Sequence, residues 1–279
     1  MIEVLRRGAR RWPWLARAYH SSRASLREAA QRMEVPLRHA PERRRLECFR
    51  HRHRGDRCFV IGNGPSLRGL DLSPLAGEVT FATNHFYFHP QVELLQPTYY
   101  CASDLWFFDK GIHPEWPRHL SRLPRGTAFF LPVELKRRVG ASVLRDCPNI
   151  HYLRCDRRRQ IWRRGEMSVD ATGVLGTGDS VIVDFCLPLA HFMGFSEVYL
   201  LGCDTDYGPG DGATHFYEAS TPSRSVEYHR DTWYENVTCS YTVARGLFEA
   251  AGRRIYNATA GGRLEVFPRV GLEDALRRS

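Results

Sequence analysis

A histidine and an aspartate in one stretch of the chain could together carry acid–base chemistry. Asp204 comes directly after the apolar run at 197–201, and His215 and His229 follow in the polar segment beyond it. An imidazole with a pKa near neutrality is suited to removing the proton of a hydroxyl group. We therefore expect His215, or His229 as its alternative, to be a catalytic base. Asp204 is expected in the same catalytic site, where it would hydrogen-bond a ligand hydroxyl.

A first glycine-rich turn could cradle a nucleotide. It follows the apolar run at 58–61 and consists of Gly62, Asn63, Gly64, Pro65 and Ser66. Small residues let backbone N–H groups approach an anion, and an asparagine can both donate to phosphate and accept from a ribose or a base. The turn is neither a dinucleotide fingerprint, because Leu67 replaces the third small residue, nor a P-loop. A purely structural turn is the alternative.

A second glycine-rich turn precedes a nearly all-apolar helix predicted from about Val181 to Met193. We expect this turn to bind an anion or a sugar through Gly176, Thr177, Gly178, Asp179 and Ser180. Two of these residues also have structural interpretations. Ser180 could be the N-cap of the helix, and Asp179 could compensate its dipole.

Metal-binding patterns are sparse. Residues 204–206 spell D-x-D, and hard oxygen ligands of this kind suit Mg²⁺ or Mn²⁺ on a diphosphate. Because such a short match is common by chance, hydrogen bonding by Asp204 is the preferred interpretation, and no metal is expected to be required. The eight cysteines occur singly, which argues against a zinc ribbon or a disulfide scaffold and favours a reducing cytoplasm. Tyr207 and Tyr217, which follow in the polar segment, are candidates for substrate binding.

Short apolar runs that end in turns predict the strands that position these residues. They lie at 58–61, 79–83, 98–102, 128–131, 197–201 and 254–257. Helices are predicted at 181–193, with Gly194 suited to the C′ position, and at about 239–251. The basic stretch 154–164 is predicted to be a loop or an excursion from the sheet. This alternation predicts an α/β fold, with a Rossmann-like, mostly parallel sheet and helices on both faces.

Polar residues follow five of the predicted strands. Parallel sheets bind ligands beyond the carboxyl ends of their strands, and those ends carry Asn63, Asn84, Asp104, Asp204 and Asn257. Asn84 and Asp104 are therefore further candidates for nucleotide binding.

The charge of the chain is concentrated near its start. The formal net charge is +9, and residues 1–57 hold 16 arginines against 6 acidic residues, a balance of +10. We expect residues 1–50 to be a basic helical extension and 51–279 to be the catalytic domain. Basic residues interleaved with aromatics suit an anionic membrane surface; the alternative is packing on the domain itself or on a second copy in a homo-oligomer. No base-readout motif indicates nucleic acid.

Neither a secretory signal nor a run of 18 uncharged apolar residues is evident. We therefore expect a cytoplasmic protein, with peripheral contact to the inner face of the membrane through residues 1–50.

The combination of motifs resembles the MptE-like family, named after an archaeal 6-hydroxymethylpterin diphosphokinase. The resemblance rests on 59–67 (FVIGNGPSL), 80–87 (TFATNHFY), 197–204 (EVYLLGCD) and His215-Phe216. The tail, 252–268, looks like a bacterial branch associated with surface-glycan genes. The first half is also similar to bacterial sialyltransferases of glycosyltransferase family 42.

The sialyltransferase resemblance implies a site for a CMP-sugar donor. Asn63 and Asn84 would contact its nucleotide, the turn at 176–178 would line its phosphate or sugar, and a histidine after Asp204 would activate the acceptor hydroxyl. It implies a glycosyltransferase of surface polysaccharide synthesis that needs no metal and acts on a glycan or lipid-linked acceptor. The alternatives are a diphosphokinase that moves pyrophosphate from ATP to a pterin-like alcohol with Mg²⁺, and a non-catalytic nucleotide-binding module.

Overall fold

The computed structural model describes residues 40–103, 105, 115–206, 215–217 and 230–278. Residues Arg45–Ser279 belong to one compact unit, and residues 40–44 form the first turn of helix α3 (Ala40–Glu47). Leu46 and Phe49 are buried in the core of the compact unit. This unit therefore includes residues 45–50, which the sequence analysis assigns to the basic extension.

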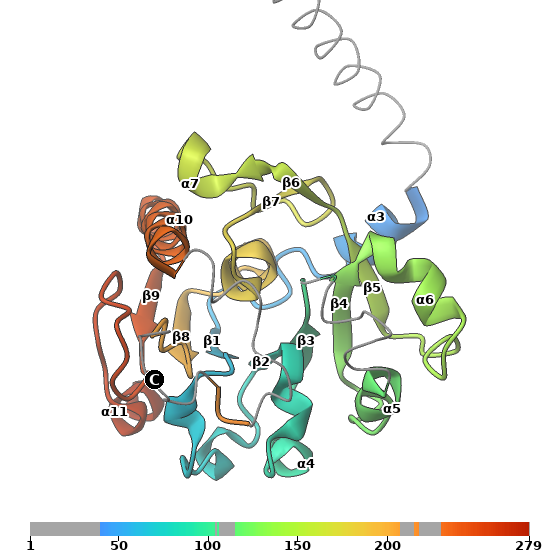
Figure 1. The fold of residues 1–279 in the computed structure, drawn as a ribbon, viewed down its shortest axis with the longest axis horizontal. Helices are drawn as coiled ribbons and strands as arrows, with labels where there is room; N and C mark the ends of the chain where they lie inside the picture. The colour runs from blue at the N-terminus through green and yellow to red at the C-terminus, as the bar shows by residue number, and fades with distance from the viewer. Residues whose placement is uncertain (1–39, 104, 106–114, 207–214, 218–229, 279) are drawn as a thin grey trace, which may run out of the picture. The chain divides into compact units, whose positions relative to one another are not determined.

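Seven parallel strands make the central sheet (Figure 1). They are β1 (Arg57–Ile61), β2 (Thr80–Thr83), β3 (Tyr99–Cys101), β4 (Ala128–Pro132), β5 (Ile150–Leu153), β8 (Glu197–Leu201) and β9 (Arg254–Asn257). Most of their residues are buried, as expected for apolar runs in a sheet that is covered on both faces. The predicted α/β fold and its six predicted strands are confirmed.

The strand order is β5-β4-β3-β2-β1-β8-β9. From β1 the chain moves outward on one side as far as β5 and then returns to place β8 on the other side of β1. The loops after β1 and β8 therefore leave the sheet in opposite directions. Such a topological switch point is where open α/β sheets bind ligands.

Two apolar layers cover the sheet. On one face lie a π-helical turn η6 (Ile182–Cys186), α8 (Leu187–Met193), α10 (Arg230–Ala250) and α7 (Ile161–Arg164). The other face is covered by four short helices and four 3₁₀ turns (Figure 1). The helices are α4 (Val92–Leu95), α5 (Trp116–Ser121), α6 (Lys136–Gly140) and α11 (Leu272–Arg277), and the turns are η1 (Pro65–Leu67), η2 (Ser73–Leu75), η3 (Asn84–Phe88) and η5 (Val133–Leu135).

Residues 154–164 are an excursion from the central sheet, and the alternative of a loop is wrong. Residues Cys155–Gln160 form strand β6, which pairs with β7 (Leu175–Thr177), and α7 follows directly. Arg157 and Arg158 are exposed whereas Ile161 is buried, so the segment has an inner and an outer side that its many arginines hide. The partner strand β7 overlaps the second glycine-rich turn, where no apolar run predicts a strand.

The helix predicted at 181–193 is present but begins as a π-helical turn. Gly194, with φ of +94°, terminates it as expected. Helix α10 begins at Arg230, earlier than predicted, because its first two turns are mostly polar and bury only one side, including Val237.

Replacing Gly246 by alanine is expected to stabilise the protein by about 1 kcal/mol, because glycine in a helix interior costs that much relative to alanine. Gly246 lies within α10, is exposed, and an added Cβ would meet no atom within 4 Å. Urea unfolding measures the change. Gly77 is the matched control, since its Cβ would also meet nothing but its φ is +91°. Gly77→Ala should therefore destabilise the protein by a similar amount. If both substitutions changed the unfolding free energy in the same direction, this account would be contradicted.

Candidate functional site

The glycines of the first turn let the ends of β1 and β8 approach each other. A Cβ on Gly62 would lie 2.4 Å from the Gly202 carbonyl oxygen, and one on Gly64 would lie 1.7 Å from Asp204 Oδ2. The Gly62 N–H donates to the Leu201 carbonyl and the Gly64 N–H to the Gly202 carbonyl, each at 2.8 Å. Because both amides already donate within the protein, they are not free to bind an anion in this arrangement.

Asp204 joins the two loops at the switch point. Its buried carboxylate accepts hydrogen bonds from the Ser66 N–H at 3.2 Å and the Ser66 hydroxyl at 2.8 Å. Burial raises the pKa of Asp204, and the bonds from Ser66 oppose that rise. Asp206, the second carboxylate of D-x-D, is exposed. Within the described part of the chain, no group of three His, Cys, Asp or Glu side chains could hold a metal ion.

Two amide oxygens lie buried at the ends of β1 and β2. Asn63 Nδ2 donates to the Thr83 carbonyl and hydroxyl, each at 2.9 Å, which turns Asn63 Oδ1 away from Thr83. Asn84 adopts a left-handed conformation with φ of +44° at the end of the neighbouring strand. Neither Asn63 Oδ1 nor Asn84 Oδ1 has a hydrogen-bond partner among the described residues. A buried acceptor without a partner costs about 1–3 kcal/mol, so each oxygen is a place for a donor group of a ligand.

Residues 215–217 lie against these strand ends. The Phe216 N–H donates to the Asn63 carbonyl at 3.1 Å, and Tyr217 Oη is 2.8 Å from His85 Nδ1. The His215 ring stacks on Tyr217 with 5.0 Å between centroids. Burial lowers the pKa of His215, which favours the neutral form of its imidazole.

The second turn surrounds a buried carboxylate. Asp184 Oδ1 accepts the Gly178 N–H at 2.6 Å and the Thr177 hydroxyl at 3.3 Å, and the Ser103 side chain also hydrogen-bonds Asp184. Burial raises the pKa of Asp184 to about 7. Its π-helical turn is of a kind frequently found at functional sites. The Gly178 amide, like those of Gly62 and Gly64, donates within the protein.

Asp179 and Ser180 tie the second turn to its neighbours. The Asp179 carbonyl accepts the Trp233 indole N–H at 3.0 Å, which links the turn to α10. Ser180 Oγ accepts the Ile182 N–H at 3.3 Å, in agreement with the capping interpretation of this serine. Gly176 lies in β7, where a Cβ would meet the Arg159 carbonyl at 2.5 Å.

The structure thus brings several predicted residues to one edge of the sheet. From β3 to β9, the residues at or just beyond the strand ends are Ser103, Asn84, Asn63, Asp204 and Asn257. Asn257 is buried with its amide bonded to Leu264 and Thr259, so it fastens the following loop. Asp104, Tyr207 and His229 lie outside the described residues.

Three polar residues at this edge are absent from the sequence-based candidates. Ser103 and His85 each adjoin a residue that was singled out, and His85 lies inside the motif 80–87, but neither was itself proposed as a site residue. Asp184 could have been identified from the sequence, because it is the single acidic residue in the apolar run 181–193. A charge in such a run is costly unless it is hydrogen-bonded, which marks it as a residue with partners.

No protein-family model matches this chain, and no curated protein or solved structure matches it either. The family resemblance drawn from its motifs therefore stays a prediction. No helix in the described ranges is both long and apolar enough to cross a membrane.

Proposed function

We propose that this protein is a glycosyltransferase that moves a sugar from a nucleotide-activated donor, with a CMP-linked sugar favoured, to a glycan or lipid-linked acceptor. The observation that carries the proposal is the pair of buried amide oxygens of Asn63 and Asn84, which have no hydrogen-bond partner among the residues that the structure describes. They lie at adjacent strand ends, and Asn63 follows a strand of the topological switch point. This is the position at which α/β sheets bind nucleotides.

The chemistry of this pair favours the nucleoside part of the donor. Amide oxygens accept hydrogen bonds, so they suit ribose hydroxyls or the exocyclic amino group of cytosine and repel phosphate oxygens. The Gly62 and Gly64 amides, which could otherwise attract phosphate, already donate to β8. The nucleoside would therefore lie over β1 and β2, with the phosphate and sugar beyond it.

His215 is the proposed base. Its neutral imidazole would take the proton of the acceptor hydroxyl as that oxygen bonds to the anomeric carbon of the sugar. The bond from this carbon to the phosphate oxygen breaks, and the nucleotide leaves with the electron pair. The step consumes no oxidant or reductant, and the residues assigned to it require no metal.

The acceptor and the location of the protein belong to the same proposal. The arginine excess of residues 1–57 suits attraction to an anionic membrane surface, where lipid-linked glycans are found. We place the protein in the cytoplasm, in peripheral contact with the inner face of the membrane. A homo-oligomer is compatible with this arrangement.

Nucleotide binding tests the first half of the proposal. Asn84→Gly removes the amide but keeps a residue that tolerates a φ of +44°. Loss of one hydrogen bond should weaken CMP binding by about tenfold, measured by calorimetry. Gln96→Gly is the control, since Gln96 also has positive φ (+46°) but is exposed at the amino side of β3. Equal CMP affinity for the two variants would contradict the role of Asn84.

Turnover tests the second half. Purified protein should release CMP from a CMP-sugar in the presence of an acceptor, and His215→Ala should slow that release while CMP still binds. Formation of AMP from ATP and a pterin-like alcohol, dependent on Mg²⁺, would instead indicate the diphosphokinase. Binding of CMP with no turnover of any donor would indicate a nucleotide-binding module.

A further inference from the structure

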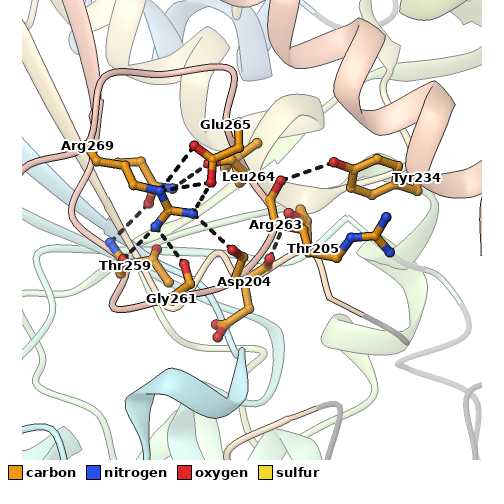
Figure 2. Close-up of polar contacts among 11 residues, drawn as sticks. Asp204, Thr205, Tyr234, Thr259, Gly261, Arg263, Leu264, Glu265 and Arg269 are labelled. Atoms are coloured by element: carbon orange, nitrogen blue, oxygen red, sulfur yellow. Dashed lines mark hydrogen bonds and ion pairs between the residues drawn. The ribbon is translucent and has the colours of Figure 1, made fainter. Parts of the chain in front are cut away.

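One arginine fastens the loop that follows β9. Arg269 Nη1 donates to the carbonyls of Thr259 at 3.2 Å and Gly261 at 2.6 Å, and Nη2 donates to the Gly262 carbonyl at 3.0 Å. The same guanidinium forms an ion pair with Glu265 at 2.6 Å (Figure 2). Three main-chain carbonyls on one side chain hold the loop 259–265 in a single conformation.

This loop is also fixed to the end of β8. The Arg263 N–H donates to the Asp204 carbonyl at 2.7 Å, and the Cys203 N–H donates to the Thr259 hydroxyl at 3.1 Å. Gly262, with φ of +71°, packs so closely that a Cβ would lie 2.6 Å from the Asp204 carbonyl oxygen. The backbone of Arg263 is therefore held beside Asp204, at the switch point of the sheet.

The Arg263 side chain projects from this anchored position. Its guanidinium lies 4.5 Å from the centre of the Tyr234 ring, and the Tyr234 hydroxyl donates to the Arg263 carbonyl at 3.1 Å (Figure 2). Arg269, by contrast, has Glu265 as its counter-ion. Among the described residues no carboxylate forms an ion pair with Arg263, which is exposed. The loop thus presents a positioned positive charge that no carboxylate of the described residues neutralises.

We propose that Arg263 binds the phosphate of the nucleotide whose nucleoside lies on Asn63 and Asn84. This inference rests on the proposed function, which supplies the position of the nucleoside. Neighbouring strands are about 4.8 Å apart, so the end of β8 lies roughly 10 Å from that of β2, within the length of a nucleotide. The guanidinium fork matches phosphate oxygens, and stacking on an aromatic ring orients it.

The glycine turns leave a role for this side chain. Because the Gly62, Gly64 and Gly178 amides donate within the protein, a phosphate at the switch point must find its donors elsewhere. The Arg263 backbone is hydrogen-bonded to Asp204, just beyond β8, which neighbours β1. Its side chain carries a positive charge that the glycine turns do not supply.

The test compares CMP with cytidine, which differ only in the phosphate. Calorimetry on the full chain should show that Arg263→Gln weakens CMP binding by about 10- to 100-fold, the loss expected for hydrogen bonds to a charged group, and leaves cytidine affinity unchanged. Arg263→Lys should recover part of the loss, since it restores the charge but not the fork. Arg254→Gln is the matched control, because Arg254 is exposed at the opposite, amino end of β9.

The outcomes separate this inference from the proposed function. If the wild type binds CMP no more tightly than cytidine, or Arg263→Gln leaves CMP affinity unchanged, the role of Arg263 is overturned while nucleotide binding stands. Should the wild type bind neither compound, the nucleotide site and the role of Arg263 are overturned together. A parallel loss of CMP and cytidine binding in Arg263→Gln would show a structural defect and would also overturn the phosphate role.

Discussion

Asp184→Asn is expected to gain stability relative to the wild type as the pH rises from about 5 to 8. Burial raises the pKa of Asp184 from an ordinary value near 3.8 to about 7. Between these two values the folded protein holds a proton that the unfolded chain releases. The contribution of Asp184 to stability is therefore present at low pH and is lost as the pH rises through about 7, at about 1.4 kcal/mol per pH unit. Asparagine does not titrate, so the variant escapes this loss.

Urea unfolding of both proteins at several pH values measures this difference. Partly buried histidines such as His151 and His191, whose pKa burial lowers to about 4, contribute slopes of the opposite sign, but they are common to both proteins and cancel. Asp146→Asn is the control, because that side chain is 89% exposed. A difference in unfolding free energy between wild type and Asp184→Asn that stays constant with pH would show that Asp184 does not titrate in this range.

Gly64→Ala is expected to cost about 3 kcal/mol or more of folding stability. The new Cβ would lie 1.7 Å from Asp204 Oδ2 and 2.7 Å from the Gly202 carbonyl oxygen. Asp204 can yield only by leaving the two hydrogen bonds from Ser66, which would strand a buried carboxylate. Overpacking of this kind costs about 1–3 kcal/mol, and an unsatisfied buried group costs a similar amount. The midpoint of urea unfolding reports the loss.

A double-mutant cycle identifies the cause. In an Asp204→Ala background the carboxylate is absent, so Gly64→Ala should cost distinctly less than in the wild type, with the clash against Gly202 remaining. Gly126→Ala is the control, since its Cβ would meet no atom within 4 Å. The same cost in both backgrounds would mean that the Asp204 contact does not account for glycine at position 64.

Apolar runs and the turns that end them were enough to predict the parallel sheet and most of the residues at its carboxyl edge. Each predicted strand is a run of apolar residues that ends in a polar or glycine turn, and this pattern follows from burial on both faces. Gly194 likewise revealed the end of α8, because a left-handed C′ residue is a local requirement. Strands β5, β6 and β7 were not predicted. Two of the four residues of β5 are polar or only partly buried, β7 overlaps the second glycine-rich turn, and arginines obscure the two sides of β6.

Which of the polar groups at that edge can bind a ligand depends on long-range contacts that no local pattern predicts. The glycine turns look open to an anion in the sequence, yet their amides are taken by β8 and by Asp184. The acceptors left unpartnered at Asn63 and Asn84, and the charge held at Arg263, depend on contacts such as Asp204 with Ser66, 138 residues apart. The apolar pattern that predicts a strand lies in consecutive residues of the chain. Whether a polar group is free to bind a ligand depends instead on which distant groups the fold brings to it.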